Sequence, residues 1–133
     1  MQRRQSVGHL AVHVAKRQHV VEAVLLLSAV AFENTGLSIA HAIATELGAI
    51  KEVAAHSLHG EHAAYGTMVQ VLAEGRSDEE REEFFAFTDS IAFPACLAAL
   101  GYAGDIEAGI AALAQATAGS AHMVNQKRPV SAD

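Results

Sequence analysis

Histidines are the residues of this sequence that are best suited to chemistry. The 133 residues include eight histidines, and His56, His59 and His62 follow one another at a spacing of three. Residues three apart lie on one face of a helix, and neutral imidazole is the commonest protein ligand for metals near neutral pH. The spacing is therefore compatible with a metal site. The alternative is that each ring is a hydrogen-bonded residue of a helical core.

His41 is a further candidate ligand, in a segment of small and apolar residues. Ala40 and Ala42 flank it, and Gly36 and Ala44 leave space around it. A polar ring in such surroundings needs either a hydrogen-bonding partner or a metal ion. The sequence has no HExxH motif and no pair of cysteines, so the spacing alone leaves both interpretations open.

Other reactive residue types give weaker signals. Cys96, which follows a Phe-Pro pair, is expected to be a small buried apolar residue rather than a nucleophile. The acidic run 78–83 is expected to be a solvated helix face. No glycine-rich phosphate-binding motif is present. The single cysteine excludes an intrachain disulfide and fits a reducing compartment, so we expect a cytoplasmic protein.

The composition favours closely packed helices. Hydrophobic residues make up 51% of the chain and aromatic residues only 5%, which is less typical of strands. The net charge of −6 argues against nucleic-acid binding. The most apolar run, 23–32, is shorter than the roughly 20 residues of a membrane span, so no membrane association is expected. A basic start followed by this run also imitates a signal peptide; the alternative is a buried helix.

The periodicity of apolar residues predicts an all-α helical bundle. Helices are expected at 19–32, 36–47, 58–73, from 77 onward, between 94 and 101, and at 106–118, with a connection at 49–57. The first of these is apolar on nearly every face, which predicts burial inside a bundle or under another domain. Phe84, Phe87 and Ile91 are expected to form a core stripe.

Several helix ends can be read from capping residues. Asn34 and Thr35 offer cap oxygens before the second helix, Ser77 with Glu80 forms a capping box, and Asp105 caps the last helix. The segment 129–133 has the features of a helix start with no helix after it. This pattern predicts a chain that is truncated at its C-terminal end.

The order and spacing of several motifs resemble the iron-containing (metal-dependent) alcohol dehydrogenases, and most closely their glycerol dehydrogenase branch. The motifs are Phe32-Glu33-Asn34-Thr35-Gly36-Leu37, Ala40-His41-Ala42-Ile43, His59-Gly60-Glu61 and Ala64-Tyr65-Gly66-Thr67. The resemblance extends over 19–133. Residues 1–18, a basic segment, match poorly, and we expect them to lie outside the domain.

The resemblance implies an NAD-binding α/β domain followed by a helical domain, with a zinc or iron ion between them. Family members hold this metal with one Asp and two His. The motifs place His41 on the first of these histidines and His59 on the second, and suggest that Glu33 and Asn34 support the entry to the His41 helix. No residue here matches the Asp, and the glycine-rich NAD domain is missing.

The resemblance thus predicts a partial glycerol dehydrogenase-like protein. The family oxidises glycerol or a related diol, a small polyol substrate, with NAD, but we expect the isolated chain to be inactive. Two alternatives stay open. The chain is either a subunit complemented by a separate nucleotide-binding chain, or a non-catalytic helical module, with or without assembly into a homo-oligomer, in which both histidines are relics.

Overall fold

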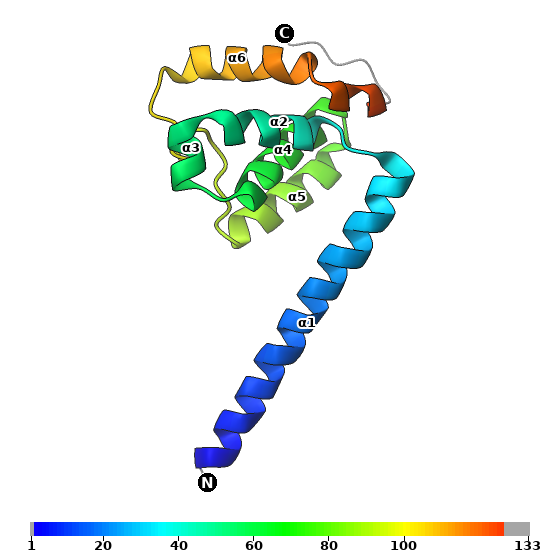
Figure 1. The fold of residues 1–133 in the computed structure, drawn as a ribbon, viewed down its shortest axis with the longest axis vertical. Helices are drawn as coiled ribbons and strands as arrows, with labels where there is room; N and C mark the ends of the chain where they lie inside the picture. Colours follow the sequence, from blue (N-terminus) through cyan, green and yellow to red (C-terminus); the bar gives the residue numbers. More distant parts are fainter. Residues whose placement is uncertain (1, 127–133) are drawn as a thin grey trace. The chain divides into compact units, whose positions relative to one another are not determined.

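The fold is entirely helical, as the sequence predicted. The computed structural model describes residues 2–126, with side chains for 15–34 and 36–126. No strand occurs in this part of the chain (Figure 1). The elements are α1 (Gln2–Thr35), α2 (Ile39–Ala49), α3 (Lys51–His56), α4 (His59–Ala73), α5 (Asp78–Ser90), α6 (Ile106–Ala118) and the 3₁₀ helix η1 (Ala121–Asn125).

The chain divides into two units, Met1–Gly36 and Leu37–Asp133. The first consists of α1, and its apolar side chains are exposed, including Val20 (62%) and Leu26 (65%). Within this unit α1 has no second element against which to bury an apolar surface, so the predicted burial inside a bundle or under another domain stays a prediction. The predicted boundary between residues 18 and 19 lies inside α1 and stays a prediction.

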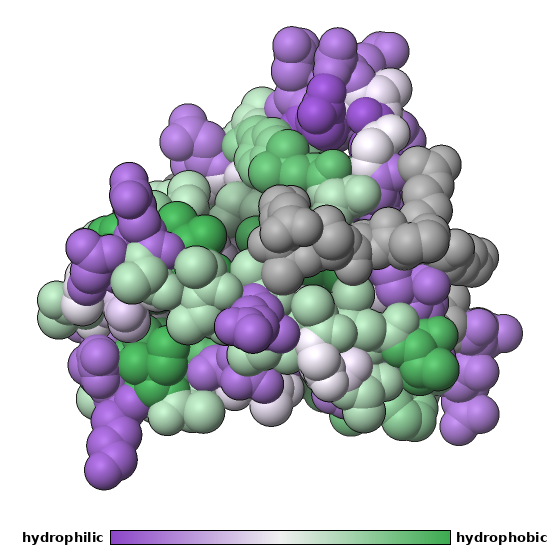
Figure 2. Space-filling model, turned by 90° about the horizontal axis from the view of Figure 1, so that it is seen from above, coloured by the Kyte–Doolittle hydropathy of each residue, from purple (hydrophilic) through white to green (hydrophobic). Residues whose placement is uncertain are grey.

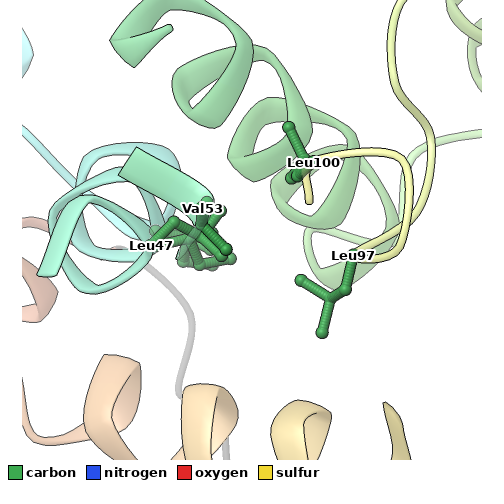
Figure 3. Close-up of a cluster of buried hydrophobic side chains, with 6 residues drawn as sticks. Leu47, Val53, Leu97 and Leu100 are labelled. Carbon is green, nitrogen blue, oxygen red and sulfur yellow. The ribbon is translucent and has the colours of Figure 1, made fainter. Parts of the chain in front are cut away.

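The core of the second unit lies where α2 and α3 meet the turn at 96–101. Leu47 of α2, Val53 of α3 and Leu100 of the turn are completely buried, and Leu97 is 3% exposed. Figure 3 shows Leu47 and Val53 beside each other. Ile39 and Ile43 extend this cluster along α2. One face of α2 therefore contributes buried side chains along the length of the core.

Helices α2 and α4 make the closest helix contact, and a glycine permits it. A Cβ atom on Gly66 of α4 would lie 2.4 Å from the Ala40 carbonyl oxygen of α2. The Ala40 amide also donates a hydrogen bond to Gln70 Oε1 (3.1 Å). Both contacts lie one residue from His41, so they fix the position of that part of α2 against α4.

The helix predicted between 94 and 101 is not formed. The segment is a series of turns, with bonds from Leu100 N to Leu97 O (3.1 Å) and from Gly101 N to Ala98 O (3.0 Å). Gly101 has a φ of +92°, which favours glycine and ends the turn. Leu97 and Leu100 point into the core while Cys96 is exposed, so the predicted burial of Cys96 is also wrong.

The predicted core stripe of α5 is wrong as well. Phe87 is 59% exposed and Ile91 47% exposed, whereas Thr88 is the buried residue of this helix. The apolar spacing is helical, but among the described helices α5 makes substantial contact with α4 only. Sequence periodicity cannot reveal that little of the face is covered.

Capping predictions are mostly confirmed. Glu80 N donates to Ser77 Oγ (3.3 Å) while Ser77 N donates to Glu80 Oε2 (3.1 Å), and Ala108 N donates to Asp105 Oδ1 (2.8 Å). Asn34 is not a cap of α2, because α1 continues through it and its side-chain amide donates to Val30 O. The predicted helix start at 129–133 lies outside the described residues.

Hydrophobic residues reach the surface at several places. On the face in Figure 2 they form separate patches among hydrophilic residues. Within the described residues no single helix is long and apolar enough to cross a membrane. One bent pair of helical segments, Ala15–Asn34 and Ile39–Ala49, has the required length and composition only when the two are taken together.

Candidate metal-binding histidine pair

His41 lies in the first turns of α2, half-buried on the part of the helix that Gly66 and Gln70 hold against α4. Its main-chain carbonyl accepts a bond from Thr45 Oγ1 (2.8 Å). The position of His41 is therefore set by the packing of α2 on α4, through the contacts of Ala40 with Gly66 and Gln70.

His59 is the first residue of α4 and is exposed. The helix start is fixed by Glu61, whose Oε2 accepts a bond from the Leu58 amide (2.7 Å). An acidic side chain in the first turn also complements the positive end of the helix. The motif His59-Gly60-Glu61 thus combines an accessible imidazole with the residue that stabilises the turn carrying it.

The structure brings His41 and His59 close enough to interact electrostatically. Burial lowers the pKa of His41, and positive charges on His59 and then His122 lower it further. A lowered pKa keeps the imidazole neutral, which is the form that binds metals. His122, on η1, was not singled out in the sequence, because its 81 residues of separation from His41 give no spacing signal.

His62, by contrast, has a structural role. It is 2% exposed, and its Nε2 lies 2.8 Å from Ser57 Oγ. Ser57 Oγ also lies 3.0 Å from the carbonyl oxygens of Val53 and Leu100, which can only accept, so a His62 tautomer that donates from Nε2 satisfies all these groups best. Burial lowers the pKa of His62, which agrees with a neutral ring. His62 thus ties α4 to α3 and the 96–101 turn.

The three histidines spaced by three do not share one helix face. His56 ends α3, and a break at residues 57 and 58 separates it from α4. Its Cβ instead packs against Gly101, where an added Cβ would lie 2.5 Å away. Only His59 and His62 share a helix, with ring centroids 6.4 Å apart and nearly perpendicular.

The side chains that the structure describes, those of 15–34 and 36–126, do not complete a metal site. His41 and His59 are chemically suited to zinc, which accepts imidazole nitrogens and commonly takes three protein ligands in catalytic sites. Yet in the described part of the chain no three His, Cys, Asp or Glu side chains are arranged to hold a metal. A carboxylate or other ligand would have to come from elsewhere.

The fold defines an all-helical unit in which the two candidate ligands, His41 and His59, lie on the packed helices α2 and α4. Comparison with known proteins gives a more specific relationship. Glycerol dehydrogenase from Citrobacter freundii is 37% identical over 100 residues, and that from Escherichia coli is 38% identical over 99 residues. Glycolaldehyde reductase from Halobacterium salinarum is 32% identical over 108 residues. No protein-family model matches the chain.

A solved structure supports the same relationship. The crystal structure of a probable glycerol dehydrogenase from Sinorhizobium meliloti matches with a TM-score of 0.70 and 33% identity, over 80% of this chain and 30% of that one. The Citrobacter match covers 75% of this chain and 27% of the relative. The chain is thus a partial relative of the glycerol dehydrogenases, and it spans little more than a quarter of their length.

Proposed function

We propose that this chain is the helical, metal-ligand-bearing part of a glycerol dehydrogenase-like oxidoreductase. His41 and His59 would be two ligands of a zinc or iron ion, and a polyol would be the substrate. The NAD-binding domain and a third ligand would come from a longer chain or a separate subunit. The observation that carries the proposal is that two histidines, 18 positions apart in sequence, lie on the packed helices α2 and α4 in a chain with glycerol dehydrogenase relatives, and that a charge on His59 lowers the pKa of His41.

The local structure supports the roles of both histidines. His41 has a lowered pKa, and His59 is accessible from solvent. Such a pair leaves coordination positions for a carboxylate and for a substrate hydroxyl. When bound, the metal would act as a Lewis acid toward that hydroxyl. The part played by this chain would be to hold two imidazoles at a fixed separation through the packing of α2 on α4.

Metal binding by the purified chain tests this proposal directly. Isothermal calorimetry with Zn²⁺ is expected to show about one equivalent bound, with weak affinity because only two ligands are present. His41→Ala and His59→Ala should each weaken binding at least about tenfold, since even supporting groups around a metal contribute that much.

His56→Ala is the matched control, because His56 lies on another helix and packs against Gly101. It should bind zinc as the unmodified chain does. Zinc binding that is unaffected by both His41→Ala and His59→Ala would refute the assignment. A chain that binds no zinc at all would favour a non-catalytic helical module.

A further inference from the structure

A cavity lies between α2, α4 and α6, away from the two histidines. It has a volume of about 130 Å³. Ile39 and Ile43 line it from α2, Tyr65 from α4, Leu113 from α6 and Met123 from η1. Neither His41 nor His59 contributes to its wall, and every lining residue belongs to the second unit.

The walls are apolar and carry no charge. Burial, and then a charge on Cys96, raises the pKa of Tyr65, so its phenol is neutral at physiological pH. A phosphate, carboxylate or ammonium group would therefore lose its hydration without gaining a counter-charge. The composition of the walls selects for an uncharged, mainly apolar molecule.

One polar group in this wall has an unmet hydrogen-bonding requirement. Thr117 is 7% exposed, and its Oγ1 has no hydrogen-bond partner among the described residues. A buried hydroxyl without a partner is destabilising. A ligand with a single hydrogen-bonding group would satisfy it while the rest of the ligand contacts isoleucine, leucine and methionine side chains.

Water is a poor occupant for such a cavity. The cavity is partly open to solvent rather than enclosed, but a water molecule against its apolar walls would find few of the roughly three hydrogen bonds that a buried water normally makes. The volume of about 130 Å³ is thus suited to a compact ring or a short aliphatic chain. The Thr117 hydroxyl, which has no hydrogen-bond partner among the described residues, adds a preference for a polar atom on that molecule, and the Tyr65 phenol is a second hydroxyl in the wall.

We propose that this cavity binds a small uncharged organic molecule with one hydroxyl group, a phenol or a short-chain alcohol, with Thr117 Oγ1 as its hydrogen-bonding partner. The inference is independent of the metal proposal, because it uses neither histidine. It assigns α6 a binding role in addition to the packing of its apolar face.

Phenol and toluene are matched probes, because they differ by a hydroxyl in place of a methyl group. Phenol is expected to shift the ¹³C-methyl resonances of Ile39 and Ile43 saturably in the purified chain. Ala114→Phe, which fills the cavity, should abolish these shifts. Ala116→Phe makes the same change at an exposed position of α6 outside the cavity wall and should preserve them. Unsaturable shifts, or equal shifts in both variants, would refute the site.

Thr117→Val tests the polar contact with an isosteric side chain. Phenol should bind this variant about fivefold more weakly, the equivalent of one ordinary hydrogen bond, while toluene affinity stays the same or rises. Unchanged phenol affinity would refute the role of Thr117. Loss of helical circular dichroism would show that Ala114→Phe does not fold. In that case Thr117→Val decides: weaker phenol binding with unchanged toluene binding indicates binding in the cavity, and equal changes for both probes indicate non-specific binding.

Discussion

Gly66 sets how closely α2 and α4 approach. It is buried on α4, and its missing side chain leaves room for the main chain of Ala40. Because His41 follows Ala40 directly, one glycine positions both the helix contact and the candidate ligand. Any larger residue would have to push α2 away from α4.

We predict that Gly66→Ala lowers the free energy of unfolding by about 1–3 kcal/mol, as overpacking in a close contact does. The added Cβ would lie 2.4 Å from Ala40 O, and main-chain atoms cannot yield as a flexible side chain can. Urea denaturation followed by circular dichroism measures the change.

Gly60→Ala on the same helix is the control, because an added Cβ there meets no atom within 4 Å. Its effect should stay within about 1 kcal/mol, in the stabilising direction expected for alanine in a helix. Equal stability losses in the two variants would show that close packing at Gly66 is not what matters.

At the scale of elements, α5 begins with reciprocal bonds between its first turn and Ser77. The Ser77 amide and then the Ser77 side chain lower the pKa of Glu80, with Arg76 as a smaller cause. These contacts stabilise the carboxylate form of Glu80. The start of α5 is therefore determined by local chemistry, although little of its apolar face is covered.

The lowered pKa of Glu80 predicts a pH dependence. A carboxyl group with a lower pKa in the folded state contributes stability above its usual pKa of 4.5, and this contribution is lost as the pH falls through the folded value. The urea midpoint of the unmodified chain should therefore decrease as the pH falls below 4.5.

Glu80→Gln should flatten that decrease, because the amide cannot titrate, and Glu83→Gln, further along the same helix, should leave it in place. The comparison requires urea denaturation curves at several pH values between neutrality and pH 3. An identical pH profile for Glu80→Gln and the unmodified chain would contradict the assigned role of the capping box.

For the whole molecule, the main fact is that the chain spans about 27% of the length of its Citrobacter relative. Its described residues supply two candidate ligands and no complete metal site. The exposed apolar residues of α1 are of the kind that another protein surface covers. A larger assembly would provide both the missing ligand and such a surface.

We predict that the purified chain does not reduce NAD with glycerol, with or without added zinc. The resemblance to glycerol dehydrogenases implies that the hydride acceptor binds to a separate α/β domain, and this chain matches only 27% of its Citrobacter relative. The measurement is NADH absorbance, with an intact glycerol dehydrogenase as the positive control. Turnover that depends on His41 would show that the chain is sufficient for catalysis, and co-purification of a nucleotide-binding protein would support complementation.

The sequence by itself determined the helical class, most helix positions and the caps at Ser77 and Asp105. These features depend on neighbours three or four residues apart, where apolar spacing and hydrogen-bonding side chains act directly. The motifs around His41 and His59 also revealed the glycerol dehydrogenase relationship, since residue order carries ancestry without any knowledge of packing.

Tertiary structure alone decided which apolar residues are buried and which histidines influence one another's pKa. Phe87 and Ile91 have core-like spacing but are exposed, while Leu97 and Leu100 are buried from a turn that was expected to be a helix. The interaction of His122 with His41, and the unsatisfied hydroxyl in the α6 cavity, also come from segments far apart in the chain. Burial and contact between distant residues depend on how helices pack, which no local pattern specifies.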